Sequence, residues 1–144
     1  MTSNSPANRI AQQCLGARLR VLNRVVSGIY DEALRPWGLK ISQLNVLVAV
    51  ARMGEAQPLR LCRVLHLDPS TLSRNVERMG KRGWLQSRPG EDARTQVLRI
   101  TPEGEALLEA VAPAWQQAQD RVTELLGQEG ADAVRALAQP FLRR

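Results

Sequence analysis

The two ends of the chain carry apolar residues at helical spacing over lengths that a small domain cannot cover by itself. No proline interrupts the segment from about Asn8 to Leu34, and its apolar residues recur at alternating spacings of four and three. These residues are Leu15, Leu19, Leu22, Val26, Ile29 and Ala33. A similar series near the C-terminus comprises Leu108, Val111, Trp115, Ala118, Val122 and Leu125. A helix exposes such a seam unless something covers it. We therefore expect the two ends to pack together and against the same ends of a second copy.

Proline and glycine set the limits of the helices at both ends. Proline disfavours helical geometry in the residue before it, so Arg35-Pro36 should end the first helix. A second helix is predicted from Leu39 to Met53, with Ser42 as a possible cap and Gly54 as its stop. Gly127 to Gly130 should break the C-terminal segment before a last helix. The apolar residues of that last helix are Val134, Leu137 and Phe141.

The middle of the chain changes from helical to strand patterning. Two short helices are predicted, Leu59 to Leu65 and Pro69 to Arg82, the second with Asp68 as N-cap and Gly83 as its left-handed end. Strands at 85–88 and 96–100 then flank a turn-rich loop, and Thr101 should cap the next helix.

This order of elements predicts a fold class and an organisation. We expect a mainly α protein with a small β-hairpin wing, in which a winged helix-turn-helix occupies residues 37–101. Dimerisation helices are expected at 8–36 and 102–144.

Positive charge is concentrated in the same middle region. The formal net charge is +6, and residues 59–99 hold nine Lys or Arg against four acids, whereas residues 100–144 hold four against seven. Phosphates neutralised by Lys or Arg release condensed counterions, so a basic middle suits a polyanion. Charge alone is equally compatible with an ordinary solvated surface. The positions of the basic side chains must therefore distinguish a polyanion-binding surface from a solvated one.

The helix predicted from Pro69 to Arg82 has one apolar and one polar face. Leu72, Val76 and Met79 share the buried face. The opposite face presents Ser70, Thr71, Arg74 and Arg78, with Ser73 and Asn75 at its margins. Short hydroxyls near a helix N-terminus, followed by arginines one and two turns later, suit a helix that reads base edges in the major groove. An ordinary amphipathic surface helix is the alternative.

The predicted hairpin loop adds a second basic element. Its tip holds Arg88 and Arg94, and a basic tip on a two-stranded wing has the size and charge to enter a minor groove. Asp92, two residues before Arg94, is expected to orient that guanidinium through a charge-assisted bond. A surface Asp–Arg pair of little consequence is the alternative.

The chain resembles the MarR family of regulators over roughly residues 10–127. The matching stretches are Leu39 to Leu47, Leu61 to Leu67, Pro69 to Arg74, Gly83-Trp84-Leu85, Asp92-Ala93-Arg94 and Leu98 to Gly104. The specific part is Asp-x-Arg followed by an apolar strand and Thr-x-x-Gly. The resemblance implies an obligate homodimer that binds a palindromic operator in double-stranded DNA, usually as a repressor. It also implies release by a small aromatic or phenolic molecule that enters a cleft between the dimer helices and the DNA-binding part.

Three residues are candidates for such a ligand pocket. Trp37 and Trp115 come from the two end regions, and Arg18 lies on the first helix. Both tryptophans are equally compatible with a role in the core or in the dimer interface, and nothing in the sequence identifies the ligand.

Cys14 offers redox sensing as an alternative signal. Some members of the family sense peroxide through a cysteine near this place, and Arg18 one turn away would favour a reactive thiolate. Such sensors hold the thiolate with tyrosines, whereas this chain has only Tyr30, so Cys14 can equally be a small apolar residue. The redox hypothesis predicts that a Cys14→Ser protein keeps its DNA binding under peroxide; loss of binding by that variant would contradict it.

Other classes of function fit the sequence less well. Cys62 and His66 have metal-ligand spacing, but two ligands do not make a site, and we expect neither metal nor cofactor. A single histidine, with no phosphate-binding glycine loop and no nucleophile–base pair, argues against an enzyme. A winged helix that binds only protein remains a rival. The absence of a spanning apolar run and of a secretory leader favours a cytoplasmic location without membrane attachment.

Overall fold

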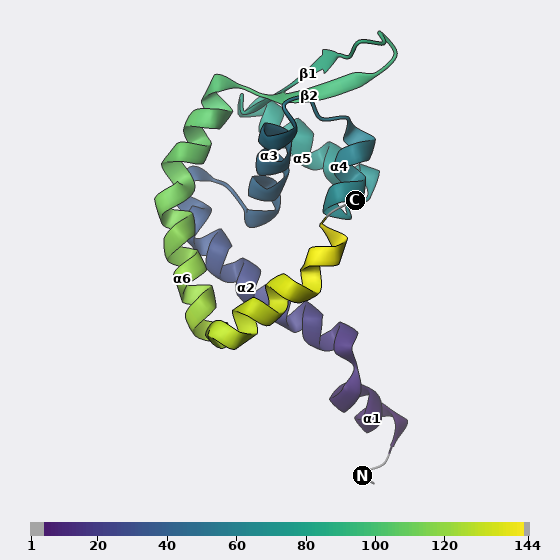
Figure 1. Cartoon of the computed structure of the whole chain (residues 1–144), viewed down its shortest axis with the longest axis vertical. Coiled ribbons are helices and arrows are strands. Elements are labelled where there is room, and N and C mark those ends of the chain that lie inside the picture. Colours follow the sequence, from purple (N-terminus) through teal and green to yellow (C-terminus); the bar gives the residue numbers. More distant parts are fainter. Residues whose placement is uncertain (1–4, 143–144) are drawn as a thin grey trace.

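The structure, a computed structural model, describes residues 5–142 and is mainly helical with one two-stranded hairpin (Figure 1). The elements in chain order are α1 (Pro6–Gln13), α2 (Leu15–Leu34), the short 3₁₀ turn η1 (Arg35–Trp37), α3 (Ile41–Met53), α4 (Pro58–Leu65), α5 (Pro69–Lys81), β1 (Leu85–Pro89), β2 (Gln96–Ile100), α6 (Pro102–Ala138) and η2 (Gln139–Phe141). The predicted fold class is confirmed. Residues 1–4, used in the expectation about a leader, and residues 143–144 of the segment 102–144 lie outside the described residues.

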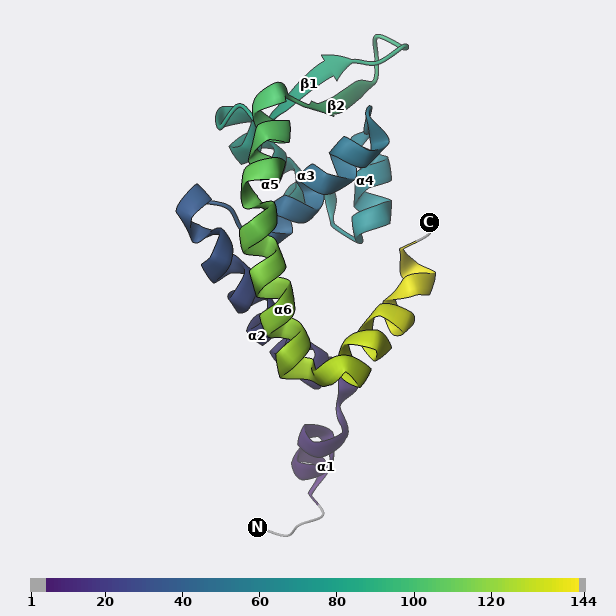
Figure 2. The same cartoon turned by 60° about the vertical axis from the view of Figure 1, so that its left-hand side comes forward.

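The first helix is not continuous, which corrects the prediction of one helix from Asn8 to Leu34. Cys14 has an extended backbone (ψ 107°) and separates α1 from α2. Its Sγ accepts the N–H of Ala17 at 3.4 Å, so Cys14 serves as the N-cap of α2. Since α1 has no buried residue, packing does not hold the two segments in one helix. As a result α1 projects away from the body of the molecule (Figures 1 and 2).

Helix α3 begins with a cap that the sequence analysis did not identify. Lys40, rather than Ser42, is its N-cap residue. The side chain of Asp31, on α2, accepts the N–H of Ile41 at 2.8 Å, and Gln43 Oε1 accepts the N–H of Lys40 at 3.0 Å. The prediction that Ser42 caps this helix was therefore wrong, because the first free N–H of the helix is bound from a neighbouring helix.

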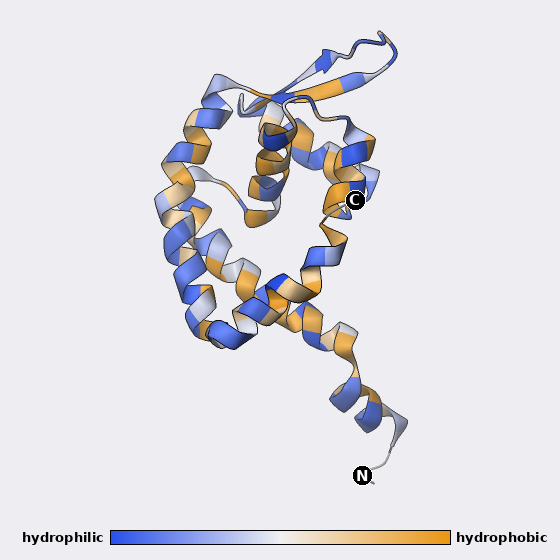
Figure 3. Ribbon diagram, viewed as in Figure 1, coloured by the Kyte–Doolittle hydropathy of each residue, from blue (hydrophilic) through white to orange (hydrophobic). Residues whose placement is uncertain are grey.

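The core lies where α3, α4, α5, the hairpin and the first part of α6 meet. Leu34, Leu47, Leu61, Met79 and Val111 are among its fully buried side chains. Apolar residues also remain on the surface of α2 and of the C-terminal region, as the hydropathy colouring shows (Figure 3). Leu15 is 74% exposed and Leu137 is 73% exposed. The long helices thus leave part of their apolar surface uncovered in the single chain.

Helix α6 first runs beside α2 and then turns back (Figures 1 and 2). The turn is at Gly127, whose φ of 72° and ψ of 160° are not helical. We call residues 128–142 the C-terminal arm. At its tip the Phe141 carbonyl lies 3.0 Å from Nε2 of His66, just after α4, and the two rings meet edge to face. None of the helices described is long and apolar enough to cross a membrane.

Candidate nucleic-acid interface

The N-terminus of α5 is built around the carboxylate of Asp68. This carboxylate accepts the N–H of Thr71 at 3.0 Å and the Thr71 hydroxyl at 2.7 Å, and it also accepts the Ser70 hydroxyl. These bonds, that from Ser70 first, hold the pKa of Asp68 well below its ordinary value. The carboxylate therefore stays charged, and a negative charge at this end of a helix is favourable. The predicted cap is confirmed.

The same bonds determine what the first turn of α5 can offer a ligand. Because the Ser70 and Thr71 hydroxyls donate to Asp68, their oxygens are left as acceptors. Arg74 Nη2 already donates to Thr71 Oγ1 at 3.4 Å. Asp68, Thr71 and Arg74 thus form a chain of bonds that holds the arginine along the helix surface.

The two faces of α5 are arranged as the spacing predicted. Leu72 and Met79 are buried, and Val76 packs against the core from a partly buried position. The predicted polar residues lie outward: Ser70, Ser73, Arg74 and Arg78 are exposed, and Thr71 and Asn75 are partly exposed. The structure therefore brings all six onto one accessible side of the helix.

The turn between α4 and α5 is closed by His66 in the left-handed conformation (φ 52°). The N–H of Leu67 donates to the Cys62 carbonyl at 3.0 Å and completes this turn. Cys62 is half-buried between α4 and α5, while the His66 ring contacts Phe141. Within residues 5–142, no group of three or more His, Cys, Asp or Glu side chains is placed to hold a metal ion.

The hairpin places two of the predicted basic residues near its tip. Strands β1 and β2 pair antiparallel, with Leu85 opposite Ile100 and Pro89 opposite Gln96. Arg88, on β1, and Arg94, in the connecting loop, are both exposed. They extend the basic surface beyond α5, on an element that protrudes from the body (Figure 1).

Asp92 has a different contact from the one predicted. Its carboxylate accepts the backbone N–H of Arg94 at 3.1 Å, whereas we expected it to hold the guanidinium. Its carbonyl accepts the N–H and the hydroxyl of Thr95, both at 2.9 Å. An aspartate two residues before an amide readily forms such a turn, so Asp92 shapes the loop and leaves the side chain of Arg94 exposed.

Sequence reasoning missed the contacts that attach the hairpin to the rest of the domain. Ala56 pairs with Leu98 through two backbone bonds of 2.9 and 2.8 Å, and Glu55 forms an ion pair with Arg99. A two-stranded hairpin is marginally stable alone, and this third partner attaches it to the segment between α3 and α4. No local signal identifies these contacts, because their partners lie more than 40 positions apart.

Arg82 is a second structural residue that was not predicted. Its guanidinium lies 4.3 Å from the centre of the Trp84 ring and donates to the Trp37 carbonyl at 2.9 Å. An arginine over an indole face is a favourable contact, and here it ties the end of α5 to η1. The adjacent Arg-Gly-Trp sequence was the available signal.

The three predicted pocket residues are not brought together. Trp37, the last residue of η1, packs against the core. Trp115 borders a shallow apolar depression between α3 and α6. Arg18 donates to the backbone carbonyl of Gln12. Cys14, the redox candidate, lies half-exposed at the break between α1 and α2.

Comparisons with known proteins identify what this arrangement resembles. The model of the MarR family matches residues 37–95. An uncharacterised HTH-type transcriptional regulator of Bacillus subtilis, YwoH, is 26% identical over 121 residues, covering 84% of this chain and 88% of that protein. The multiple antibiotic resistance protein MarR of Salmonella typhimurium is 28% identical over 96 residues, covering 66% of this chain and 67% of that protein.

Solved structures share the fold. A probable transcriptional regulator from Pseudomonas aeruginosa superposes with a TM-score of 0.81 at 25% identity, covering 90% of this chain and 98% of that one. A mutant MarR from Escherichia coli, complexed with operator DNA, gives a TM-score of 0.81 at 23% identity and covers 92% of this chain and 96% of that one.

Proposed function

Because the chain belongs to the MarR family, we propose that it is a sequence-specific DNA-binding repressor that acts as a homodimer on a palindromic operator. In this proposal α5 enters the major groove and the hairpin tip enters the adjacent minor groove. The hydroxyls and arginines of α5 meet base edges and phosphates. The operator complex of the Escherichia coli relative, which has the same fold, supports DNA as the partner.

One observation carries the proposal. The exposed arginines of the helix-turn-helix and of the wing lie on α5 and on a hairpin that contacts α5 through β1 and is attached to the domain by the Ala56–Leu98 pairing. A basic surface made only for solubility needs no such fixed geometry. A winged helix that binds only protein likewise does not need the bond through which Thr71 positions Arg74.

The dimer and the release from DNA complete the proposal. The exposed apolar residues of α2 and of the C-terminal arm support a second copy as the partner. Two-fold symmetry then places half-sites about one helical turn of DNA apart. A small-molecule inducer, of the phenolic or aromatic class that the family resemblance implies, would release the protein from the operator. The protein would act in the cytoplasm, where its DNA is.

Selection of bound DNA from a random pool, followed by a salt titration, tests the proposal. We expect an inverted repeat to be enriched, because a two-fold dimer reads two equal half-sites. We also expect affinity for the enriched site to fall about 10³- to 10⁵-fold between about 50 and 200 mM salt if six to ten phosphates are contacted. Recovery of no enriched sequence, or an affinity that salt leaves unchanged, would contradict the proposal and favour a protein partner.

A further inference from the structure

Two hydroxyls in the first turn of α5 already donate their hydrogens within the protein. A charged carboxylate can only accept hydrogen bonds, so Ser70 and Thr71 are the donors in their bonds to Asp68. These bonds, that from Ser70 first, keep the pKa of Asp68 well below its ordinary value and the carboxylate charged. A hydroxyl has one hydrogen and two acceptor lone pairs. Both hydroxyl oxygens, and the carboxylate itself, can therefore meet a further partner only as acceptors.

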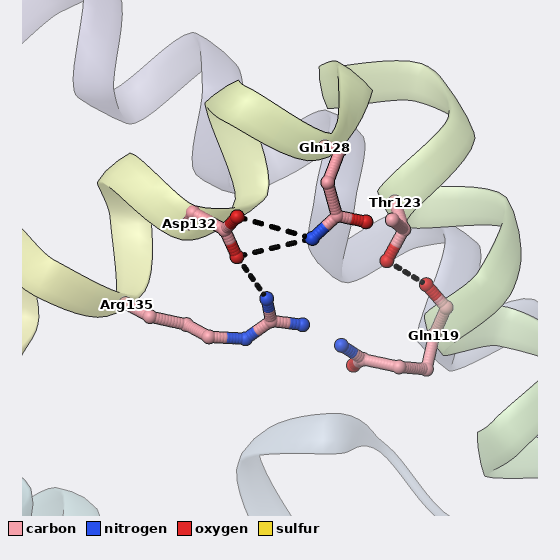
Figure 4. Close-up of polar contacts among 5 residues, drawn as sticks. All are labelled: Gln119, Thr123, Gln128, Asp132 and Arg135. Atoms are coloured by element: carbon pink, nitrogen blue, oxygen red, sulfur yellow. Dashed lines mark hydrogen bonds and ion pairs between the residues drawn. The ribbon is translucent and has the colours of Figure 1, made fainter.

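Such a fixed polarity requires donors that carry a single hydrogen. Asp132, in the C-terminal arm, also accepts from two side chains, Nε2 of Gln128 at 3.1 Å and Nη1 of Arg135 at 2.8 Å (Figure 4). An amide nitrogen and a guanidinium carry several N–H groups, so both can still donate to another ligand. A serine or threonine hydroxyl that donates to a carboxylate has no hydrogen left. The first turn of α5 is therefore restricted to one kind of partner, a hydrogen-bond donor.

Asp68 also occupies the place at which the N-terminus of a helix attracts an anion. Such ends commonly bind phosphate through their free N–H groups. In α5 the carboxylate of Asp68 accepts the N–H of Thr71 at 3.0 Å and itself supplies the favourable negative charge. A phosphate oxygen only accepts hydrogen bonds, and at this position it would also meet a like charge. Contacts with the DNA backbone are therefore left to other side chains.

Ser70 is the more available of the two hydroxyls. Ser70 and Asp68 are exposed, whereas Thr71 is partly exposed and its Oγ1 already accepts from Arg74 at 3.4 Å. Within residues 5–142, no group donates to Oγ of Ser70. Its lone pairs thus lie open on the accessible side of α5, one turn before Arg74, whose remaining N–H groups are donors. Along this face the helix presents acceptors first and donors one turn later.

We propose that Ser70, held by Asp68, reads an exocyclic amino group of the operator in the major groove, either N4 of cytosine or N6 of adenine. These amino groups are the donors that base edges present there, whereas guanine N7 and O6 and thymine O4 only accept. An acceptor that faces another acceptor leaves both unpaired, which weakens binding. At the position that Ser70 faces, each half-site should therefore disfavour guanine and thymine. This proposal rests on the proposed DNA-binding function and adds the chemical group that the first turn of α5 selects.

Removal of single amino groups from the operator tests the proposal with the full-length protein. In the inverted repeat recovered by selection, each adenine is replaced in turn by purine and each cytosine by pyrimidin-2-one, at matching positions of both half-sites. Affinities are measured for the unchanged protein and for Ser70→Ala, whose altered side chain is exposed. At one position the replacement should weaken the unchanged protein about two- to tenfold more per half-site than it weakens Ser70→Ala. Weaker base pairing in the modified duplex affects both proteins equally and cancels. The base at that position identifies which amino group is read.

Ser73→Ala is the matched control, because Ser73 carries an exposed hydroxyl on the same helix that, among the described residues, donates to no carboxylate. At the position coupled to Ser70 it should respond to the replacement as the unchanged protein does. Absence of any position coupled to Ser70, while the operator is still bound specifically, would overturn the proposal. Coupling of Ser70→Ala to a phosphate neutralised as methylphosphonate would overturn it as well, because the hydroxyl would then be a donor to the backbone.

Selection of DNA with Asp68→Asn gives a second, independent measurement. Asparagine is as good an N-cap as aspartate, but it brings a donor and lacks the charge, so the Ser70 hydroxyl is no longer restricted to accepting. This variant should admit guanine or thymine at the position coupled to Ser70, and an unchanged base preference there would overturn the role of Asp68. Failure of the unchanged protein to bind any sequence specifically is a different result, which contradicts the proposed function and this proposal together.

Discussion

Replacing Arg74 and Arg94 by alanine together should reduce operator affinity to the level of non-specific binding. Arg74 lies on the exposed face of α5, about one turn after Thr71, to whose hydroxyl oxygen it donates. A good bidentate contact from arginine to a base changes discrimination about five- to 150-fold, and Arg94 supplies charge at the wing tip, where a narrow minor groove attracts it. We expect each single change to weaken binding by a factor in that range. Fluorescence anisotropy with the selected operator measures the effect.

Arg74 should differ from Arg78 and Arg88 in its effect on sequence preference. Arg74→Ala should relax the preference at the bases that α5 faces, whereas Arg78→Ala or Arg88→Ala should weaken all sequences similarly and reduce the salt slope by about one each. Arg121→Ala on α6 is the control for loss of charge alone. An operator affinity that stays unchanged in the Arg74/Arg94 double variant would refute the assignment of α5 and the wing to DNA.

The parts of the interface that were predictable are those in which a few neighbouring residues determine the local structure. Asp68-Pro69 and Thr101-Pro102 each provide a cap and a first helical residue, and both helices begin there. Gly83 adopts the left-handed conformation that ends α5. Because a cap needs only the residues of one turn, sequence alone identifies it.

The features that were missed depend on partners far apart in the chain. The Tyr30–Gln119 bond joins residues 89 positions apart, and the Glu55–Arg99 pair joins residues 44 positions apart. The break at Cys14 was missed for a different reason. An apolar series indicates which face of a helix is buried, but it continues across a cap residue whose side chain replaces one backbone bond. Spacing therefore predicted the contact between α2 and α6 correctly and the continuity of the first helix wrongly.

The bend of α6 was predicted only in part, because sequence patterns indicate where a helix is interrupted but not the direction of the segment that follows. The glycines at 127 and 130 predicted an interruption, yet only Gly127 leaves the helical conformation, and the helix resumes directly after it. The direction in which the arm leaves depends on what it packs against, and its contacts with α2 and His66 are long-range. Consequently the cavity of about 370 Å³ between α2, α6 and the arm had no signal in the sequence.

Gly104 explains why the Thr-x-x-Gly sequence matters for the wing. Thr101 Oγ1 accepts the N–H of Gly104 at 3.0 Å, and the N–H of Thr101 donates to the Trp84 carbonyl at 3.0 Å. This brings the backbone before β1 directly against the first turn of α6. A Cβ on Gly104 would lie 2.3 Å from the Trp84 carbonyl oxygen and 2.7 Å from Cγ1 of Ile100. Since the first of these atoms belongs to the backbone, rotation of a side chain cannot relieve the contact.

Gly104→Ala should therefore destabilise the protein, although alanine is the better helix former. Overpacking costs about 1–3 kcal/mol and at times more, and a contact with backbone belongs at the upper end, so we expect a net loss of about 2 kcal/mol in urea unfolding. Gly28→Ala is the matched control, because Gly28 lies within α2 and an added Cβ there meets nothing within 4 Å. It should gain up to about 1 kcal/mol. Equal stabilities of the two variants would show that the backbone contact between Trp84 and the first turn of α6 adjusts at little energetic cost. A lower free energy of unfolding in Gly104→Ala alone would show that this backbone contact is rigid. A rigid contact holds the hairpin at a fixed position relative to the domain, which simultaneous contact of α5 and the hairpin tip with two grooves requires.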